Sequence, residues 1–158
     1  MLLKYFGTNN VSQLKIKKEV GGIKKYGVAA LKLAKYASYF GFNTYCYSYY
    51  RRLQKTNIIT KKPSKPIIIK YLNKKLPIIA CVRSHYLYNE KPLREGHFIV
   101  VSGYDNKNFY YNDPYDRKSK KINQQLFMRA LNEQAHDYLE YLLIIDKKEN
   151  QKNININK

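Results

Sequence analysis

Two neighbouring segments decide the fold: residues 77–82, PIIACV, and residues 96–115, GHFIVVSGYDNKNFYYNDPY. The first is a short apolar run opened by Pro77, which predicts a buried strand over residues 78–83. The second predicts a central strand over 96–104, a tight turn, and a returning strand over 109–111 that stops at Asn112-Asp113-Pro114. Together these segments predict an antiparallel sheet in the second half of the chain.

The rest of the chain supplies helices and two further strands. Helices are predicted over residues 1–6, from a cap at Asn10 or Ser12 to Val20, and over 28–40, 66–74 and 122–132. Each of the first three is followed by glycine, which adopts the positive φ of a helix end at low cost. Strands are predicted over 42–49 and 138–145, and loops over 50–65 and 84–95. Helices followed by antiparallel strands with one inserted helix indicate an α+β fold.

Composition restricts the class of protein. The chain has 158 residues, 44% of them hydrophobic, and no apolar run approaches the roughly 18–20 residues that cross a bilayer. The N-terminal residues lack the pattern of a secretory signal. Cys46 and Cys81 are too few for a disulfide scaffold and lack the spacing of a zinc site. We therefore expect one soluble, cytoplasmic domain over 1–146 with no metal and no cofactor, and a polar, disordered tail over 147–158.

The charge is strongly positive and uneven. The net charge is +19, and residues 1–75 hold 17 of the 30 Lys and Arg residues but a single acid, Glu19. Clustered cations favour nucleic acids or anionic membranes through counterion release. Here the cations are mostly lysines that are scattered along the chain. Lys, Asn, Ile and Tyr are all abundant and share A/T-rich codons, so a biased genome would produce the same excess of positive charge. Because no nucleic-acid-binding pattern accompanies them, a nucleic-acid partner is the less favoured interpretation.

His97 and Asp113 form the candidate site. His97 lies at the start of one predicted strand, and Asp113 lies directly after the strand that pairs back. An Asp that accepts from one imidazole nitrogen fixes the tautomer and leaves the other nitrogen as a base. The same two residues also fit a structural histidine at a strand edge beside an Asn-Asp-Pro turn. His85 and His136 have the sequence surroundings of surface residues.

The segments PIIACV and GHFIVVSGYDNKNFYYNDPY, followed by a helix that contains LFMRAL, resemble the double-glycine leader peptidases. These are papain-like cysteine peptidases of family thirty-nine, which trim leader peptides and often precede an ABC exporter. MLLKYFG and GVAALKLAKYASYFGFNT are similar to the paired helices of the same family. The resemblance covers residues 1–146. It implies helices packed on an antiparallel sheet, a peptide or leader-peptide substrate, an ABC exporter as possible partner, and a place at the cytoplasmic face of the membrane.

By the same resemblance, His97 is the general base and Asp113 orients it. The family nucleophile is a cysteine that begins the helix running into MLLKYFG, and it follows a glutamine of the oxyanion hole. MLLKYFG begins this chain, so that cysteine would lie about two helical turns, roughly 10 Å, before Met1. Cys46 and Cys81 fall in predicted buried strands, where a thiol acts as an apolar filler. We therefore expect a peptidase-like domain that is inactive as these 158 residues stand.

Two other functions stay open. A domain that keeps the family's cleft without its chemistry would bind peptides and not cut them. A basic module would bind DNA or RNA through the positive first half of the chain. Papain-like folds also host acyl transferases, so the fold alone does not decide for hydrolysis.

Overall fold

The computed structural model describes residues 2–7, 11–22, 30–48, 58–59, 61–92, 96–133 and 142–147. The helices in these ranges are α1 Leu2–Tyr5, α2 Gln13–Glu19, α3 Ala30–Tyr39, α4 Lys65–Asn73, α5 His85–Tyr88 and α6 Gln124–Asn132. The strands are β1 Phe42–Tyr47, β2 Ile58–Ile59, β3 Ile78–Arg83, β4 Gly96–Tyr104, β5 Asn108–Asn112, β6 Ser119–Asn123 and β7 Leu142–Lys147.

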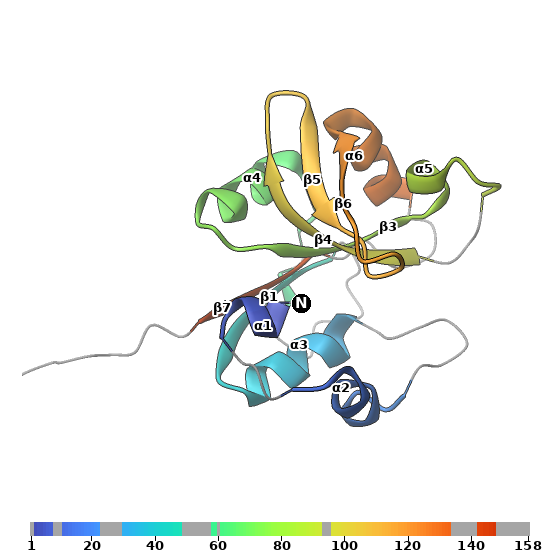
Figure 1. Ribbon diagram of the computed structural model, residues 1–158. Coiled ribbons are helices and arrows are strands. Elements are labelled where there is room, and N and C mark those ends of the chain that lie inside the picture. The colour runs from blue at the N-terminus through green and yellow to red at the C-terminus, as the bar shows by residue number, and fades with distance from the viewer. Residues whose placement is uncertain are drawn as a thin grey trace, which may run out of the picture.

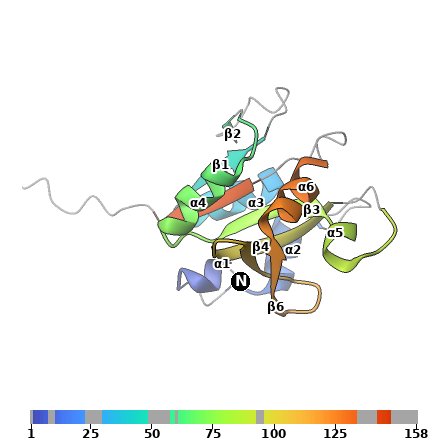
Figure 2. The ribbon, with the colours of Figure 1, turned by 90° about the horizontal axis from the view of Figure 1, so that it is seen from above.

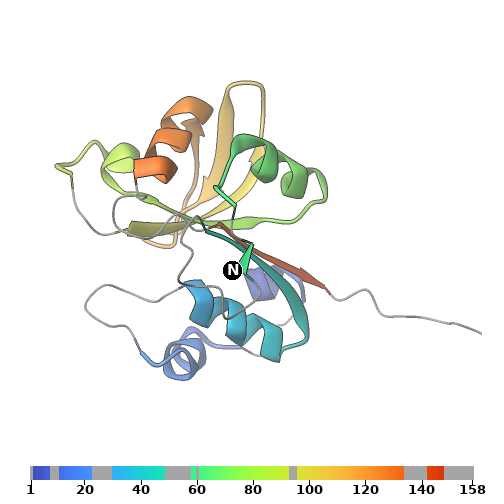
Figure 3. The same cartoon turned by 180° about the vertical axis from the view of Figure 1, so that it is seen from behind.

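The strands form one sheet in the order β2-β1-β7-β3-β4-β5-β6. Every pairing is antiparallel except that of β1 with β2. Helices α4, α5 and α6 lie above the sheet in Figure 1, and α1, α2 and α3 lie below it. The strands β5 and β6 rise out of the sheet toward α6, as the view from behind also shows (Figure 3). This architecture confirms the predicted α+β fold.

Alternating residues of the central strands divide the core between the two faces of the sheet. On one face, Ile78, Ala80 and Val82 of β3 pack in a cluster with α4 and α6. On the other face, Cys81 packs in a cluster with α1 and α3. Adjacent residues of a strand point to opposite faces, so the continuous apolar run of β3 follows from helices covering both sides. Seen from above, α4 and α6 lie across the strands (Figure 2).

Local sequence signals set several helix ends. Ser12 caps α2, because its side chain accepts from the backbone N–H of Lys15 at 3.1 Å. Asn123 caps α6 in the same way, accepting from Gln125 N at 2.9 Å. Gly41 follows α3 with φ +82, a left-handed conformation that glycine adopts without steric cost. These caps are short-range, so the sequence pattern predicts them well.

Three segments differ from the sequence prediction. The predicted loop 50–65 contains β2, which extends the sheet beside β1. The predicted loop 84–95 contains the short helix α5. Residues 122–123 were predicted to begin a helix but end β6, because Ile122 is buried opposite Phe109 of β5. Pairing with β5 therefore outweighs the helical pattern at that point.

Some predicted element ends cannot be compared with the structure. Residues 28–29, 49, 138–141 and 148–158 lie outside the described ranges, while β7 extends to Lys147, the first residue of the predicted tail. Within the described ranges, no helix has the length and apolar character needed to span a membrane.

Candidate active site

The β4–β5 hairpin brings His97 and Asp113 together. The register pairs Val100 with Asn112, so Asp113, the next residue, falls on the opposite face of the sheet, which His97 and Ile99 share. His97 Nε2 lies 2.9 Å from Asp113 Oδ1. The two residues that sequence spacing had suggested as a pair are therefore in hydrogen-bond contact.

Asp113 is a buried carboxylate surrounded by donors. Its side chain has no exposed surface, and its Oδ1 accepts from the backbone N–H of Tyr115 at 2.9 Å. The Tyr88 hydroxyl donates to Oδ2, and Lys120 Nζ lies 3.5 Å from the same oxygen. Burial by itself raises the pKa of Asp113, but the hydrogen bonds from Tyr88, Tyr115 and His97 together outweigh it and lower that pKa. Asp113 is thus an anion at neutral pH.

The contacts of Asp113 decide the tautomer of His97. A carboxylate can only accept, so the hydrogen bond to Asp113 requires the proton of the neutral imidazole to be on Nε2. The other ring nitrogen, Nδ1, then carries a lone pair, and no described group bonds to it. The side chain of His97 is 23% exposed, which leaves the ring within reach of an incoming group. An imidazole held in this way can take a proton at Nδ1 and pass it on.

Tyr88 and Lys120 complete the surroundings of the pair, and neither was singled out in the sequence analysis. Tyr88 comes from α5, within a segment that the sequence predicted as a loop. Lys120 comes from β6, where its ammonium group also lies 2.8 Å from Asp116 and 5.0 Å from the centre of the Tyr88 ring. The length of the loop was the only sequence signal for a role of residues 84–95. Nothing in the local sequence of β6 marked Lys120 among thirty cationic residues.

Both cysteines lie on the far side of the sheet from this pair. Cys46 and Cys81 are each 2% exposed and belong to the cluster that packs on α1 and α3. Burial raises the pKa of each thiol to about 12. A thiol in this state has almost no thiolate at neutral pH, so neither is suited to act as a nucleophile.

The remaining histidines fall elsewhere. His85 is not a free surface residue as predicted, because its side chain is 15% exposed and its Nε2 lies 3.5 Å from Glu133 Oε2. His136 lies outside the described residues. Across the part of the chain that the structure describes, no group of three or more His, Cys, Asp or Glu side chains is arranged to hold a metal ion.

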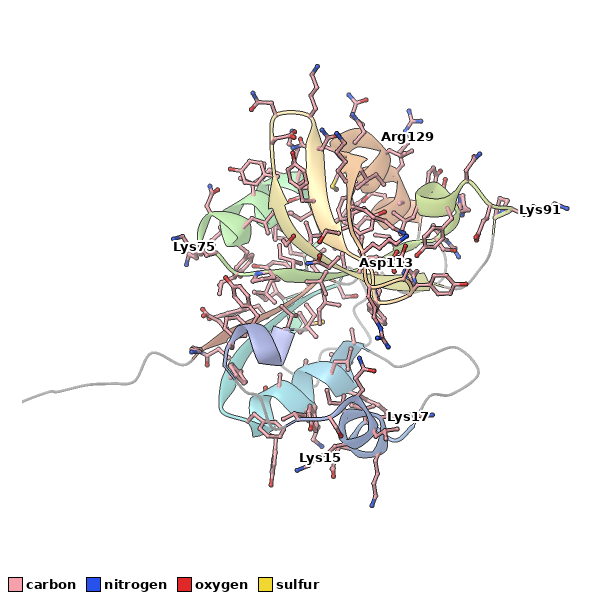
Figure 4. All side chains as sticks on the ribbon, in the orientation of Figure 1. Lys15, Lys17, Lys75, Lys91, Asp113 and Arg129 are labelled. Atoms are coloured by element: carbon pink, nitrogen blue, oxygen red, sulfur yellow. The ribbon has the colours of Figure 1, made fainter. Side chains whose placement is uncertain are left out.

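Five cations labelled in Figure 4 come from different elements of the described chain. Figure 4 shows Lys15 and Lys17 on α2, Lys75 after α4, Lys91 after α5 and Arg129 on α6, which point outward on different sides. Asp113 is labelled in the same view near the ends of β4 and β6, away from these side chains. These five side chains therefore do not line a single groove.

Known proteins resemble this chain in sequence and in fold. The model of a family described as "Peptidase_C39 like family" matches residues 1–141. Among solved structures, the peptidase domain of Streptococcus ComA, a bi-functional ABC transporter involved in a quorum sensing pathway, aligns with a TM-score of 0.62 and 19% sequence identity. The alignment covers 92% of this chain and 85% of that chain, so it establishes the papain-like fold. No curated protein matches the sequence.

Proposed function

Because the chain belongs to the peptidase C39-like family, we propose that it is the leader-peptidase-like part of a cysteine peptidase, with His97 as the general base. The observation that supports this most directly is the His97–Asp113 hydrogen bond of 2.9 Å, with Nδ1 left free. Asp113 orients the ring and stabilises the imidazolium that forms during the reaction.

The proposed reaction is acyl transfer to a thiol. His97 Nδ1 takes the thiol proton, and the thiolate attacks the scissile carbonyl carbon. His97 returns the proton to the leaving amine as the C–N bond breaks, and an acyl-enzyme thioester remains. A water molecule then gives a proton to Nδ1 and attacks the thioester carbonyl carbon, the C–S bond breaks, and the proton on Nδ1 returns to the thiolate. Nε2–H donates to Asp113 in every state, so the pair need not rearrange.

The thiol of this reaction is neither Cys46 nor Cys81. Both are buried on the face of the sheet opposite His97, and their pKa is about 12. We therefore propose that the 158 residues do not hydrolyse peptides by themselves. By family resemblance the nucleophile precedes the segment that forms α1.

The proposed substrate is a leader peptide that ends in small residues, as in the double-glycine leaders of the family. The proposed partner is an ABC exporter, since the solved relative is the peptidase domain of an ABC transporter. With that partner, the domain would act at the cytoplasmic face of the membrane. The dispersed cations of Figure 4 give no comparable support to a nucleic-acid substrate.

The test combines terminal sequencing with a cleavage assay. Intact mass and N-terminal sequencing of the protein from its source cells give the native start. The native protein and the 158-residue chain are then incubated with a synthetic leader peptide that carries a Gly-Gly site, and products are identified by mass spectrometry. We expect cleavage only where a cysteine precedes α1, and loss of cleavage in a His97→Ala variant.

Single substitutions test the roles of His97 and Asp113 separately in the same assay. Asp113→Asn is expected to lower kcat by roughly 10²- to 10⁴-fold, because the amide holds the ring in place less well. Tyr104→Phe is the control, since the Tyr104 hydroxyl bonds Asn73 and not the His97–Asp113 pair. Full activity in His97→Ala would refute the assignment of the base. Saturable binding of the leader peptide to a native protein that never cleaves it would instead identify a peptide-binding domain.

A further inference from the structure

Tyr88 contacts both members of the His97–Asp113 pair. Its hydroxyl donates to Asp113 Oδ2 and lies 3.0 Å from His97 Nε2. Its ring packs against the imidazole edge to face, with centroids 5.7 Å apart and planes at 61°. Among the described residues, the proposed reaction uses only His97 and Asp113, so the contacts of Tyr88 need a separate explanation.

The single proton of the Tyr88 hydroxyl fixes the direction of the hydrogen bonds. Asp113 only accepts, so the Tyr88 proton points to Oδ2. The Tyr88 oxygen therefore faces His97 Nε2 as an acceptor. Nε2 then has two acceptors around it, Asp113 Oδ1 at 2.9 Å and the Tyr88 oxygen at 3.0 Å. A proton on Nε2 satisfies both, whereas a bare Nε2 would place three sets of lone pairs against one another.

Neighbouring groups hold Tyr88 in this position. Its helix, α5, is tied to the end of α6, because the Tyr86 hydroxyl donates to Glu133 and His85 pairs with the same carboxylate. Figures 1 and 3 show α5 and α6 side by side above β3. Lys120 lies against the Tyr88 ring, and burial together with the bond to Asp113 raises the pKa of Tyr88. The hydroxyl thus keeps its proton at neutral pH.

We propose that Tyr88 is a positioning residue for the base: by bonding His97 and Asp113 at once, it holds the imidazole in the Nε2–H form and keeps Nδ1 free to take a proton. The inference rests on the proposed function, in which Nδ1 is the basic nitrogen. Tyr88 acts through His97 and does not touch the reacting atoms.

The test is nitrogen NMR of the histidine rings in the 158-residue chain, which requires no activity. A His97→Gln variant assigns the His97 signals. Tyr88→Phe removes only the shared hydroxyl, and Tyr104→Phe is the matched control, since it removes a tyrosine hydroxyl that bonds Asn73 and does not hold α5. Carbon NMR of the carboxyl groups follows the titration of Asp113 in each protein.

We expect Nε2 protonated and Nδ1 bare in the unaltered chain and in Tyr104→Phe. In Tyr88→Phe we expect a measurable fraction of the Nδ1–H form. The pKa of Asp113 should also rise by about one unit, since a hydrogen bond to a charged group is lost.

An Nδ1–H form in the unaltered chain would overturn the inference. Unchanged histidine and Asp113 signals in Tyr88→Phe would do the same. The same changes in Tyr104→Phe would show that the effect is not specific to the Tyr88 hydroxyl and would also overturn the inference. Failure of the native protein to cleave peptides, with the expected NMR result, would reject only the proposed function.

Discussion

At the scale of single residues, Asp113 is a fully buried carboxylate that accepts several hydrogen bonds. A fully buried carboxylate is unfavourable unless donors surround it, and here Tyr88, Tyr115, His97 and Lys120 do so. The donors around Asp113 stabilise its anionic form, and Asp113 in turn orients His97. Stability and chemistry therefore depend on the same hydrogen bonds.

We predict that Asp113→Asn lowers the free energy of unfolding by about 2 kcal/mol at neutral pH, since bonds to a charged acceptor are lost. Denaturant unfolding followed by circular dichroism measures this change. The control is Asp116→Asn, which removes a carboxylate bonded to Lys120 at a partly exposed position. Equal stability of the Asp113→Asn variant and the unaltered chain would contradict the prediction.

The buried thiols give a second prediction at this scale. With a pKa of about 12, against 9.0 for an ordinary thiol, Cys46 and Cys81 hold roughly a thousandfold less thiolate at neutral pH. We expect iodoacetamide to leave both unmodified in the folded chain and to label both in guanidinium chloride. Peptide mass spectrometry identifies the labelled residue. Rapid labelling of either thiol in the folded chain would make that cysteine a candidate nucleophile again.

At the scale of elements, the site depends on one hairpin and one short helix. The β4–β5 hairpin supplies His97 and Asp113 in fixed register, whereas α5 has only four residues and little helical stability of its own. Its position depends on Glu133 at the end of α6. We infer that α5 is the part of the site most easily displaced.

We predict that Glu133→Ala speeds hydrogen exchange at Leu87 and Tyr88, whose amides bond the Ser84 carbonyl at 2.8 and 3.1 Å. The contacts of the half-exposed Glu133 carboxylate with Tyr86 and His85 contribute about 1 kcal/mol, so a roughly fivefold acceleration is expected. Ile99 of β4 should keep its rate. Exchange rates come from NMR, with Gln125→Ala on the exposed face of α6 as control. No difference at Tyr88 would show that other contacts hold α5.

At the scale of the whole molecule, the main feature is the large excess of positive charge. The chain carries +19 at neutral pH, and its few carboxylates include three with a lowered pKa, Asp105, Asp113 and Asp116. A group whose pKa is lowered by folding stabilises the native state above its unfolded pKa. That stabilisation is lost as the pH falls through the folded pKa. Protonation of carboxylates in acid also leaves the cations without counter-charges.

We therefore predict that the melting temperature falls as the pH drops below about 4, where carboxylates of the unfolded chain begin to bind protons. Added salt should raise the melting temperature in acid by screening repulsion among the cations. Differential scanning calorimetry at low and high salt measures both effects. A melting temperature that is independent of salt in acid would show that self-repulsion is not the cause.

The sequence by itself determined the elements whose signals are local. Caps such as Ser12, the apolar run of β3 and the turn of the β4–β5 hairpin depend on neighbouring residues alone, and the structure places them as predicted. The turn brings His97 and Asp113 to neighbouring strands, but it does not by itself place them on one face. The register shifts between Val101 and Gly103, and this irregularity puts Asp113 on the face of the sheet that His97 shares. The resemblance to leader peptidases rested on these same segments.

Only the tertiary structure decided what depends on distant contacts. β2 and β6 exist because they pair with β1 and β5, and their own residues carry no clear strand signal. Tyr88 and Lys120 meet at Asp113 from a short helix and an edge strand, separated by 32 positions in the chain. Sequence patterns report which face of an element is apolar, whereas the direction in which a single polar side chain points is set by packing against remote elements.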